Sequence, residues 1–237
     1  MISAVVPVMN RSDRIIPCLS TWIDQDQIGE IVIVDWSSSV PIKTDPILSK
    51  FLNHWKIKIV RVNDETSFIS MSHSLNVGVT HATGDHIIKI DIDYQLKNPE
   101  LLRILERNQF KKHLFCGTIP NKENYDFHGF CFFEKRFFTE INGYNENCRG
   151  WGFDDEDFYR RMESVGLDRV VVMNISDFIY HIPHDDDLRV ANYPQKDKKI
   201  TNRANEDMTK KGEKYEMSKY ITVIKERNYV ELVREKK

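Results

Sequence analysis

The sequence predicts an α/β protein in which helices flank a mostly parallel central sheet. Short apolar segments alternate with helical patterns through the first hundred residues, and parallel strands joined by crossover helices produce this order. Some of these segments are continuous runs of β-branched residues, such as Ile31 to Val34. Runs of this kind are typical of strands that are buried on both faces of a sheet.

The local pattern defines each element of the first half. Short apolar runs predict strands at residues 2–8, 31–34, 57–62 and 86–90. Apolar residues at helical spacing predict helices near 12–23 and 72–80. Asn98, Pro99 and Glu100 indicate the start of a further helix, because they supply a cap, a proline at the first helical position and an acid in the first turn.

The second half contains fewer regular signals. Residues 135–165 hold two predicted helices separated by a glycine-rich loop at 142–152, and strands are predicted at 170–173 and 178–181. Beyond about residue 185 the chain is polar and charged, with a weak helical periodicity at Tyr220, Ile221, Ile224, Val230 and Val233. We therefore expect one catalytic domain over 1–195, with halves at 1–97 and 98–195, and a charged, partly helical tail at 196–237.

Composition excludes several classes of protein. The 237 residues are 41% apolar, and 34 basic residues balance 36 acidic ones, which argues against a disordered chain and against nucleic acid as a partner. No stretch approaches the ~20 apolar residues of a transmembrane helix. The four cysteines form no CxxC pair, so we expect separate buried thiols. We also expect a cytoplasmic location, without a secretory signal.

Asp91 and Asp93 are the first candidate site. The pattern Asp-x-Asp occurs at four places in the chain, but only this pair directly follows an apolar strand. Ligands of open α/β sheets bind at the carboxyl ends of the strands. Carboxylates at that position suit a divalent cation that also contacts phosphate oxygens. A solvated turn is the alternative interpretation.

The second candidate site is the segment from Gly150 to Asp157. Four consecutive acids begin a predicted helix, and negative charge is favourable at a helix N-terminus. A surface cap would explain one or two of the acids, but it would not explain Trp151 between two glycines. An indole beside bare backbone offers a stacking face for a sugar ring, and a carboxylate next to it is suited to act as a general base.

Three further features are weaker on their own. His181 and His184 form an HxxH pattern at a strand end and are candidates to complete a metal site with Asp93. Asp35 ends a strand, where an acid either binds a nucleotide or forms a turn. Arg11 follows the first strand, where it either meets a phosphate or lies on the surface.

Taken in order, these motifs resemble the GT-A glycosyltransferases. The motifs are PVMNR, IVIVD, SLNVGVTHATGD, IIKIDID, INGYNE, GWGFDDEDFYRRM and the closing HxxH. They are most similar to those of family-2-like enzymes and of catalytic domains of the β-1,4-galactosyltransferase and chondroitin-polymerase type. The resemblance covers about residues 2–195. It implies a GT-A fold with a nucleotide-sugar-binding half, and an acceptor half that contains a smaller acceptor-side subregion.

The resemblance also implies roles for individual residues. Asp155 falls where inverting members place the general base, and Asp154 falls where they place an acid that binds the acceptor. Asp93 is the expected direct ligand of Mn²⁺ or Mg²⁺, completed by His184, with His181 and Asp91 beside it. The residues implied in binding a UDP-sugar donor or the sugar pocket are Pro7, Arg11, Asp35, Asn76, Gly78, Asp91, Asp93, Trp151 and Gly152. Phe153 and His128 stand where relatives often have glycine.

The expected function is an inverting, metal-dependent transfer of a hexose or N-acetylhexosamine from a UDP-sugar to a hydroxyl of a saccharide or glycoconjugate. A non-catalytic nucleotide-sugar-binding module and a sugar nucleotidylyltransferase are the alternatives. A weak membrane-surface or subunit contact through Tyr220, Ile221 and Ile224 is a further hypothesis. Because the first strand starts at residue 2, we expect a bare catalytic domain plus tail, without the anchor and stem that lumenal relatives carry.

Overall fold

A computed structural model describes residues 1–64, 68–118, 125–185, 187, 190–212 and 214–235. The strands are β1 (Ile2–Val8), β2 (Ile28–Trp36), β3 (Ile57–Asn63), β4 (His86–Lys89), β5 (Tyr94–Leu96), β6 (His113–Cys116), β7 (Cys131–Glu134), β8 (Asp168–Val171), β9 (Ile179–His181), β10 (Tyr220–Lys225) and β11 (Tyr229–Arg234). The helices are α1 (Ser12–Ile23), α2 (Ser49–Leu52), α3 (Met71–His81), α4 (Glu100–Asn108), α5 (Lys135–Glu140), α6 (Asp154–Ser164) and α8 (Lys198–Lys210).

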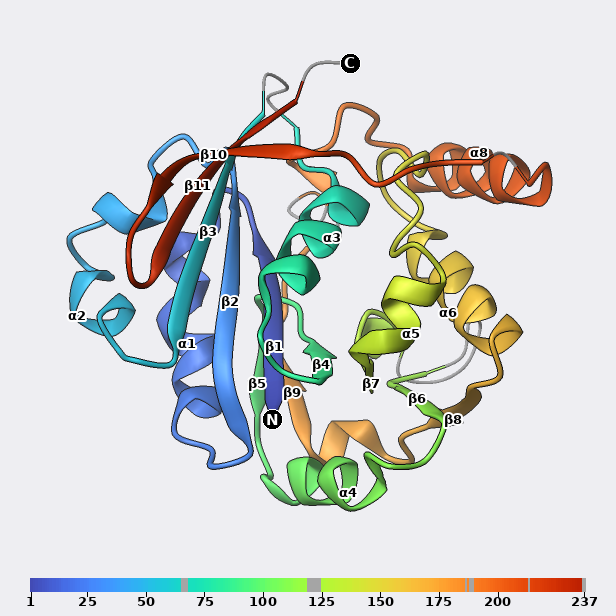
Figure 1. Ribbon diagram of the computed structural model, residues 1–237, viewed down its shortest axis with the longest axis horizontal. Coiled ribbons are helices and arrows are strands. Elements are labelled where there is room, and N and C mark those ends of the chain that lie inside the picture. Colours follow the sequence, from blue (N-terminus) through green and yellow to red (C-terminus); the bar gives the residue numbers. More distant parts are fainter. Residues whose placement is uncertain (65–67, 119–124, 186, 188–189, 213, 236–237) are drawn as a thin grey trace.

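One large, mostly parallel sheet organises these elements (Figure 1). Its strand order is β10-β11-β3-β2-β1-β4-β7-β6-β8. Neighbouring strands from β11 to β4 are parallel, whereas β7 is antiparallel to both β4 and β6, and β10 is antiparallel to β11. A separate two-stranded sheet pairs β5 with β9. The expected α/β class with a mostly parallel sheet is confirmed.

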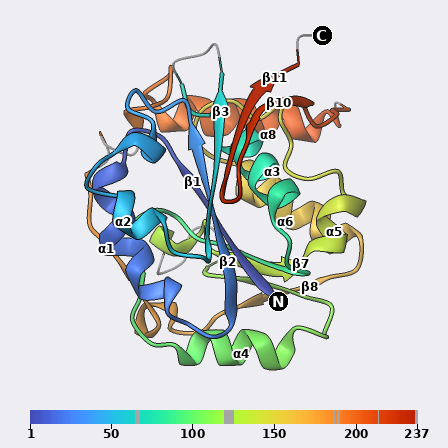
Figure 2. The ribbon, with the colours of Figure 1, turned by 60° about the vertical axis from the view of Figure 1, so that its left-hand side comes forward.

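Helices cover both faces of the sheet, as Figure 2 shows with α1 and α2 on one side and α3, α5 and α6 on the other. The sequence of β2 explains this arrangement, because alternate residues of a strand point to opposite faces. Ile31 and Ile33 belong to the apolar cluster that includes α1 and α4, whereas Val32 and Val34 belong to the cluster of α3, α5 and α6. The continuous β-branched run thus serves two cores at once.

The C-terminal segment requires a correction. The helical pattern expected at Tyr220, Ile221, Ile224, Val230 and Val233 is wrong, since these residues form the hairpin of β10 and β11. The segment YITVIK is rich in β-branched residues, which favour strands, and β3 offers an edge on which β11 pairs in parallel. Among the described residues of 196–237, the helical segment is α8.

The hairpin is therefore a part of the main sheet. Leu232 is buried in the same apolar cluster as α3, and Asn63 of β3 donates a side-chain hydrogen bond to Glu231 (2.6 Å). Of the three residues suggested for a membrane or subunit contact, Ile221 and Ile224 are exposed, whereas Tyr220 packs edge-on against Trp36. Among the described helices, none combines the length and the apolar character needed to span a bilayer.

If the hairpin belongs to the core, truncating its buried side chain destabilises the whole protein. We expect Leu232→Ala to lower the free energy of unfolding by about 2–4 kcal/mol, because it removes buried methyl groups and leaves a cavity. Val233→Ala is the matched control, since Val233 is 36% exposed, and it should cost less than about 1 kcal/mol. Urea unfolding followed by circular dichroism measures both variants. Equal, near-zero effects would show that the hairpin is detached from the fold.

Candidate active site

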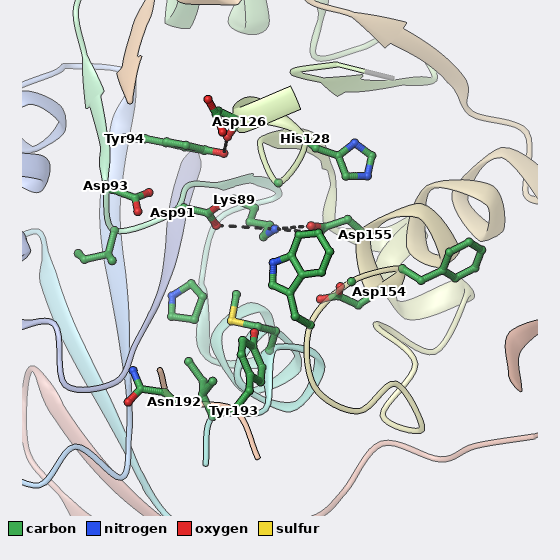
Figure 3. A pocket seen from close by; sticks show the side chains of 18 of the residues that line it. Lys89, Asp91, Asp93, Tyr94, Asp126, His128, Asp154, Asp155, Asn192 and Tyr193 are labelled. Carbon is green, nitrogen blue, oxygen red and sulfur yellow. Dashed lines mark hydrogen bonds and ion pairs between the residues drawn. The ribbon is translucent and has the colours of Figure 1, made fainter. Parts of the chain in front are cut away.

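A pocket of about 440 Å³ opens at the carboxyl ends of β1 and β4 (Figure 3). Pro7 and Val8 of β1, Lys89 of β4 and the following Asp91 and Asp93 line one side of it. The first residues of α6 line another side, together with Trp151 and Gly152 from the preceding loop. Its size is in the ordinary range for a small-molecule site, and its place is the one at which α/β sheets bind ligands.

Asp93, His181 and His184 form a candidate metal centre. Oδ2 of Asp93 lies 3.0 Å from Nε2 of His184 and 3.8 Å from Nε2 of His181. One ligand atom from each residue lies within 4.8 Å of the other two. A carboxylate with two imidazoles fits a transition metal such as Mn²⁺ better than Mg²⁺, which prefers oxygen ligands.

The small sheet brings these distant residues together. His181 ends β9 and pairs with Tyr94 of β5, the residue immediately after Asp93. The backbone N–H of Ile182 donates to the carbonyl of Asp93 (2.8 Å), which fixes the start of the HxxH turn. Burial alone would raise the pKa of Asp93, but hydrogen bonds from His181 and His184 hold it well below its usual range. The carboxylate is therefore ionised, as a metal ligand must be.

Two polar atoms at this side of the pocket lack a hydrogen-bond partner among the described residues. They are Oδ1 of Asp91 and Nη2 of Arg11, and both atoms are buried. Arg11 lies 3.6 Å from Asp93 through the same nitrogen. A free acceptor and a free donor beside the metal candidates fit a cation and an anionic phosphate respectively.

Lys89 joins the two acidic groups of the pocket. Its ammonium group donates to both carboxylate oxygens of Asp155, at 2.8 and 3.1 Å, and lies 3.8 Å from Oδ1 of Asp91 (Figure 3). Burial alone would lower the pKa of Lys89, but the charges of Asp155 and Asp91 raise it above its usual range. Lys89 is thus a buried, permanently charged cation between two of the expected functional acids.

Asp154 and Asp155 differ in their electrostatic surroundings. Burial, followed by the charge of Asp155, raises the pKa of Asp154 to about 7. Lys89 pairs directly with Asp155, whose side chain is 15% exposed. Neighbouring carboxyls with different surroundings commonly divide the acid and base roles of a site. Near neutral pH the raised pKa favours an Asp154 that is partly protonated, next to the ion pair of Lys89 and Asp155.

Helix α8 fixes the loop before α6. Thr201 donates a hydrogen bond to the carbonyl of Trp151 (2.7 Å), and Asn205 donates to the carbonyl of Gly152 (2.7 Å). Gly152 has a φ of +96°, which side chains rarely adopt, and a Cβ there would lie 2.5 Å from Asn202. The tight Gly-Trp-Gly loop and α8 therefore define this wall together.

The structure brings most of the expected site residues to one pocket. Those that line it are Pro7, Arg11, Asp91, Asp93, Trp151, Gly152, Asp154, Asp155, His181 and His184. Asp35, Asn76 and Gly78 do not line it.

Asp35 belongs to the framework behind the pocket. It is fully buried, and its carboxylate accepts hydrogen bonds from Arg61 (2.6 Å) and from the backbone N–H groups of Ser38 (3.2 Å) and Ile42 (3.1 Å). These bonds shape the turn after β2, as expected of a turn-forming aspartate. Both oxygens of the carboxylate already accept these hydrogen bonds, and the nucleotide contact expected of Asp35 stays a prediction.

Asn76 and Gly78 act within the fold at α3. Asn76 accepts from the backbone N–H of Tyr144 (2.7 Å) and donates to Glu146 (2.9 Å), which ties α3 to the loop after α5. A Cβ on Gly78 would lie 2.4 Å from a methyl group of Val5 and 2.9 Å from one of Val34. Gly78 therefore permits α3 to pack closely on β1 and β2.

Some pocket residues were absent from the sequence interpretation. Lys89 had a signal, namely a lysine within the apolar strand His86 to Ile90, since a buried lysine requires a partner. Asn192, Tyr193, Asn202 and Glu206 also line the pocket. They lie in or beside α8, in a polar region without a local motif, so only the folded chain places them at the site.

Family models match most of the chain. The model of glycosyl transferase family 2 matches residues 3–148, and a model described as the N-terminal domain of galactosyltransferase matches residues 112–185. The chain belongs to glycosyltransferase family 2, and it is a glycosyltransferase. No curated protein sequence matches it.

Solved structures with the same fold include a galactosyltransferase, a mannosyltransferase and a protein in complex with UDP-GlcNAc. The catalytic domain of Drosophila β1,4-galactosyltransferase 7, in complex with xylobiose, has a TM-score of 0.66 at 16% identity over 100% of this chain and 94% of that one. The mannosyltransferase PcManGT of Pyrobaculum calidifontis, in complex with GDP-Man and Mn²⁺, has a TM-score of 0.58 at 17% identity over 73% and 55%. S. aureus TarS in complex with UDP-GlcNAc has a TM-score of 0.60 at 15% identity over 78% and 59%. These likenesses confirm the GT-A fold.

The raised pKa of Asp154 predicts a pH dependence of stability. The folded protein keeps a proton that the unfolded chain releases near the ordinary pKa of 3.8. The contribution of Asp154 to the free energy of unfolding therefore falls as the pH rises from about 4 to 7. In Asp154→Asn this contribution is absent. We expect the difference between wild type and variant to change by about 1–3 kcal/mol over this range, less than the full shift because the carboxyl faces the pocket water.

Urea unfolding at pH 4, 5, 6 and 7 in EDTA measures the difference in free energy of unfolding between wild type and Asp154→Asn. Asp168→Asn is the control, because Asp168 is exposed at the start of β8 and should give the same difference from wild type at every pH. A pH-independent difference between wild type and Asp154→Asn would contradict the assignment of the raised pKa to Asp154.

Proposed function

We propose that the protein is an inverting, metal-dependent glycosyltransferase that moves a hexose or N-acetylhexosamine from a UDP-sugar to a saccharide hydroxyl. The observation that carries this proposal is the presence, in one pocket, of the metal candidates Asp93, His181 and His184 opposite the acids Asp154 and Asp155. Figure 3 shows Asp93 and Asp155 on opposite sides, with Asp91 and Lys89 between them. Transfer of a sugar needs both sets of groups.

The first set accounts for the leaving group. Mn²⁺ held by Asp93, His181 and His184 would neutralise the diphosphate as it leaves, which is an electrostatic contribution of several kcal/mol. Arg11 is placed to donate to a phosphate oxygen from its free Nη2, and Pro7 lines the same wall. Relatives of the same fold support this reading, because PcManGT was solved with GDP-Man and Mn²⁺ and the Drosophila galactosyltransferase with manganese and UDP-Gal.

The second set accounts for the nucleophile. An acceptor hydroxyl oxygen attacks the anomeric carbon while the bond from that carbon to the diphosphate oxygen breaks. The hydroxyl proton passes to Asp155, and UDP departs. Asp154 would bind the acceptor, and Trp151 with Gly152 would form the wall for the sugar rings. A base opposite the leaving group delivers the acceptor to the other face of the sugar, so the anomeric configuration inverts.

The two alternative functions have weaker support. A sugar nucleotidylyltransferase holds a triphosphate and would need a glycine-rich, basic loop after β1, but residues 9–14 contain no glycine. Release of pyrophosphate from UTP and a sugar phosphate would establish that activity. A non-catalytic binding module would not need Asp155 with a buried cation beside it. Binding of UDP-sugars without turnover on any acceptor would establish that alternative.

The proposal predicts that Asp155 is essential for turnover and dispensable for donor binding. We expect Asp155→Asn to lower kcat by about 10²- to 10⁴-fold, the usual contribution of a general base. The affinities for Mn²⁺ and UDP should change less than about threefold, because Asp155 is not among the metal candidates. Release of UDP, measured with Mn²⁺ over a panel of UDP-sugars and saccharide acceptors, gives the rate. Asp168→Asn serves again as the exposed control, and full activity of Asp155→Asn would refute the proposed role.

A further inference from the structure

Lys89 is a charged residue at an unusual position in the sheet. It ends β4, a central strand, where its backbone lies beside Val5 of β1 and Cys131 of β7. Its side chain is only 3% exposed. Burying an ammonium group is costly, and a paired one commonly adds little stability relative to an apolar side chain. Fold stability alone therefore gives no reason for a lysine at this position.

The contacts of Lys89 point to Asp155. The ammonium donates to both oxygens of that carboxylate, at 2.8 and 3.1 Å, whereas the distance to Oδ1 of Asp91 is 3.8 Å, beyond hydrogen-bond length. A carboxylate has about four lone-pair sites. Two bonds to Lys89 therefore leave acceptor capacity on Asp155 for a substrate hydroxyl.

This ion pair connects two parts of the molecule that are far apart in sequence. Asp155 is the second residue of α6, and the loop before it has positive φ values at Gly150, Gly152 and Phe153. Helix α8 holds the loop through its backbone carbonyls, and Lys89 holds the Asp155 carboxylate itself. The direction of that carboxylate is thus set from β4.

We propose that Lys89 is a positioning residue that holds the Asp155 carboxylate at the point where it meets the acceptor hydroxyl. This inference rests on the proposed function of Asp155 as the base. Lys89 acts through Asp155 and donates to no reacting atom.

Gly129 offers a second, independent way to disturb the pair. A Cβ at this position would lie 2.9 Å from Nζ of Lys89 and 2.7 Å from Oδ2 of Asp91. Gly129→Ala would therefore displace the ammonium group without removing any charge. The absence of a side chain at 129 is part of the geometry that seats Lys89.

The test compares steady-state kinetics of Lys89→Met with wild type. We expect kcat to fall by about 10²-fold, the effect typical of a catalytic group displaced by about 1 Å. The acceptor KM and the Kd of Mn²⁺ should stay within threefold. The control is Lys56→Met, since Lys56 is another buried lysine, which donates to the carbonyls of Ile23 and Gln25 and does not line the pocket. This control should keep the wild-type kcat.

A double variant distinguishes action through Asp155 from a general disturbance. In the Asp155→Asn background, Lys89→Met should cause no further loss of the residual rate. An additional loss equal to that in the wild-type background would overturn the proposal. A second result would also overturn it: saturating Mn²⁺ restores the kcat of Lys89→Met, and the Kd of Mn²⁺ is raised tenfold or more. Lys89 would then act through Asp91.

The remaining outcomes are also decisive. If Lys89→Met does not fold, Gly129→Ala replaces it and should lower kcat in the same way at saturating Mn²⁺, the condition that removes any effect of its Cβ on Asp91. A kcat that is unchanged, or that saturating Mn²⁺ restores, would overturn the proposal. A normal kcat for Lys89→Met, with Asp155→Asn inactive, refutes the role of Lys89 alone. Full activity of Asp155→Asn refutes the proposed base, and with it the function on which this inference rests.

Discussion

Four of the carboxylates that line the pocket are those of Asp91, Asp93, Asp154 and Asp155, and the site depends on how their charges are balanced. Each carboxylate at the edge of the sheet is partly or fully removed from water, which disfavours its charged form. The chain offsets this with hydrogen bonds from His181 and His184 at Asp93 and with a buried ammonium at Asp155. Asp154 forms no ion pair with a described residue, and burial together with the charge of Asp155 raises its pKa to about 7.

The fold brings these charged groups together from separate parts of the chain. The end of β4 delivers Lys89 and, two and four residues later, Asp91 and Asp93. The small sheet of β5 and β9 then carries His181 and His184 back to the same point. The acids of α6 arrive from the opposite side, at a helix N-terminus that itself favours negative charge. The result is a pocket with one site suited to a metal ion and another suited to a base.

Much of the fold and part of the candidate site were predictable from local sequence patterns. The buried strands, the helix at Asn98 to Glu100 and the acids after β4 follow from rules that act within a few residues. The HxxH pattern made His181 and His184 candidates for a metal site, and the order of the family motifs added support, because two histidines near a loop are a weak signal by themselves. At Asp35 the local pattern left a nucleotide contact and a turn as alternatives, and the structure shows the turn, whose backbone and Arg61 donate to the carboxylate.

Long-range pairing was not predictable in the same way. The apolar periodicity of the segment that forms β10 and β11 predicted a weak helix. The segment forms a pair of strands because β3 offers an edge on which β11 pairs. The partnership of Lys89 with Asp155 spans 66 positions in the chain. Helix α8 is a similar case, because no local pattern predicts its hydrogen bonds to the carbonyls of Trp151 and Gly152.

We propose that a metal ion binds at Asp93, His181 and His184, with Asp91 beside it, and not at Asp155, whose carboxylate is paired with Lys89. Anomalous diffraction at the manganese edge, from crystals grown with Mn²⁺ and UDP, tests it most directly. We expect one strong anomalous peak within about 2.0–2.4 Å of ligand atoms of Asp93, His181 and His184, with the Lys89–Asp155 ion pair intact. A peak bound by Asp154 and Asp155 instead, or none in the pocket, would contradict it.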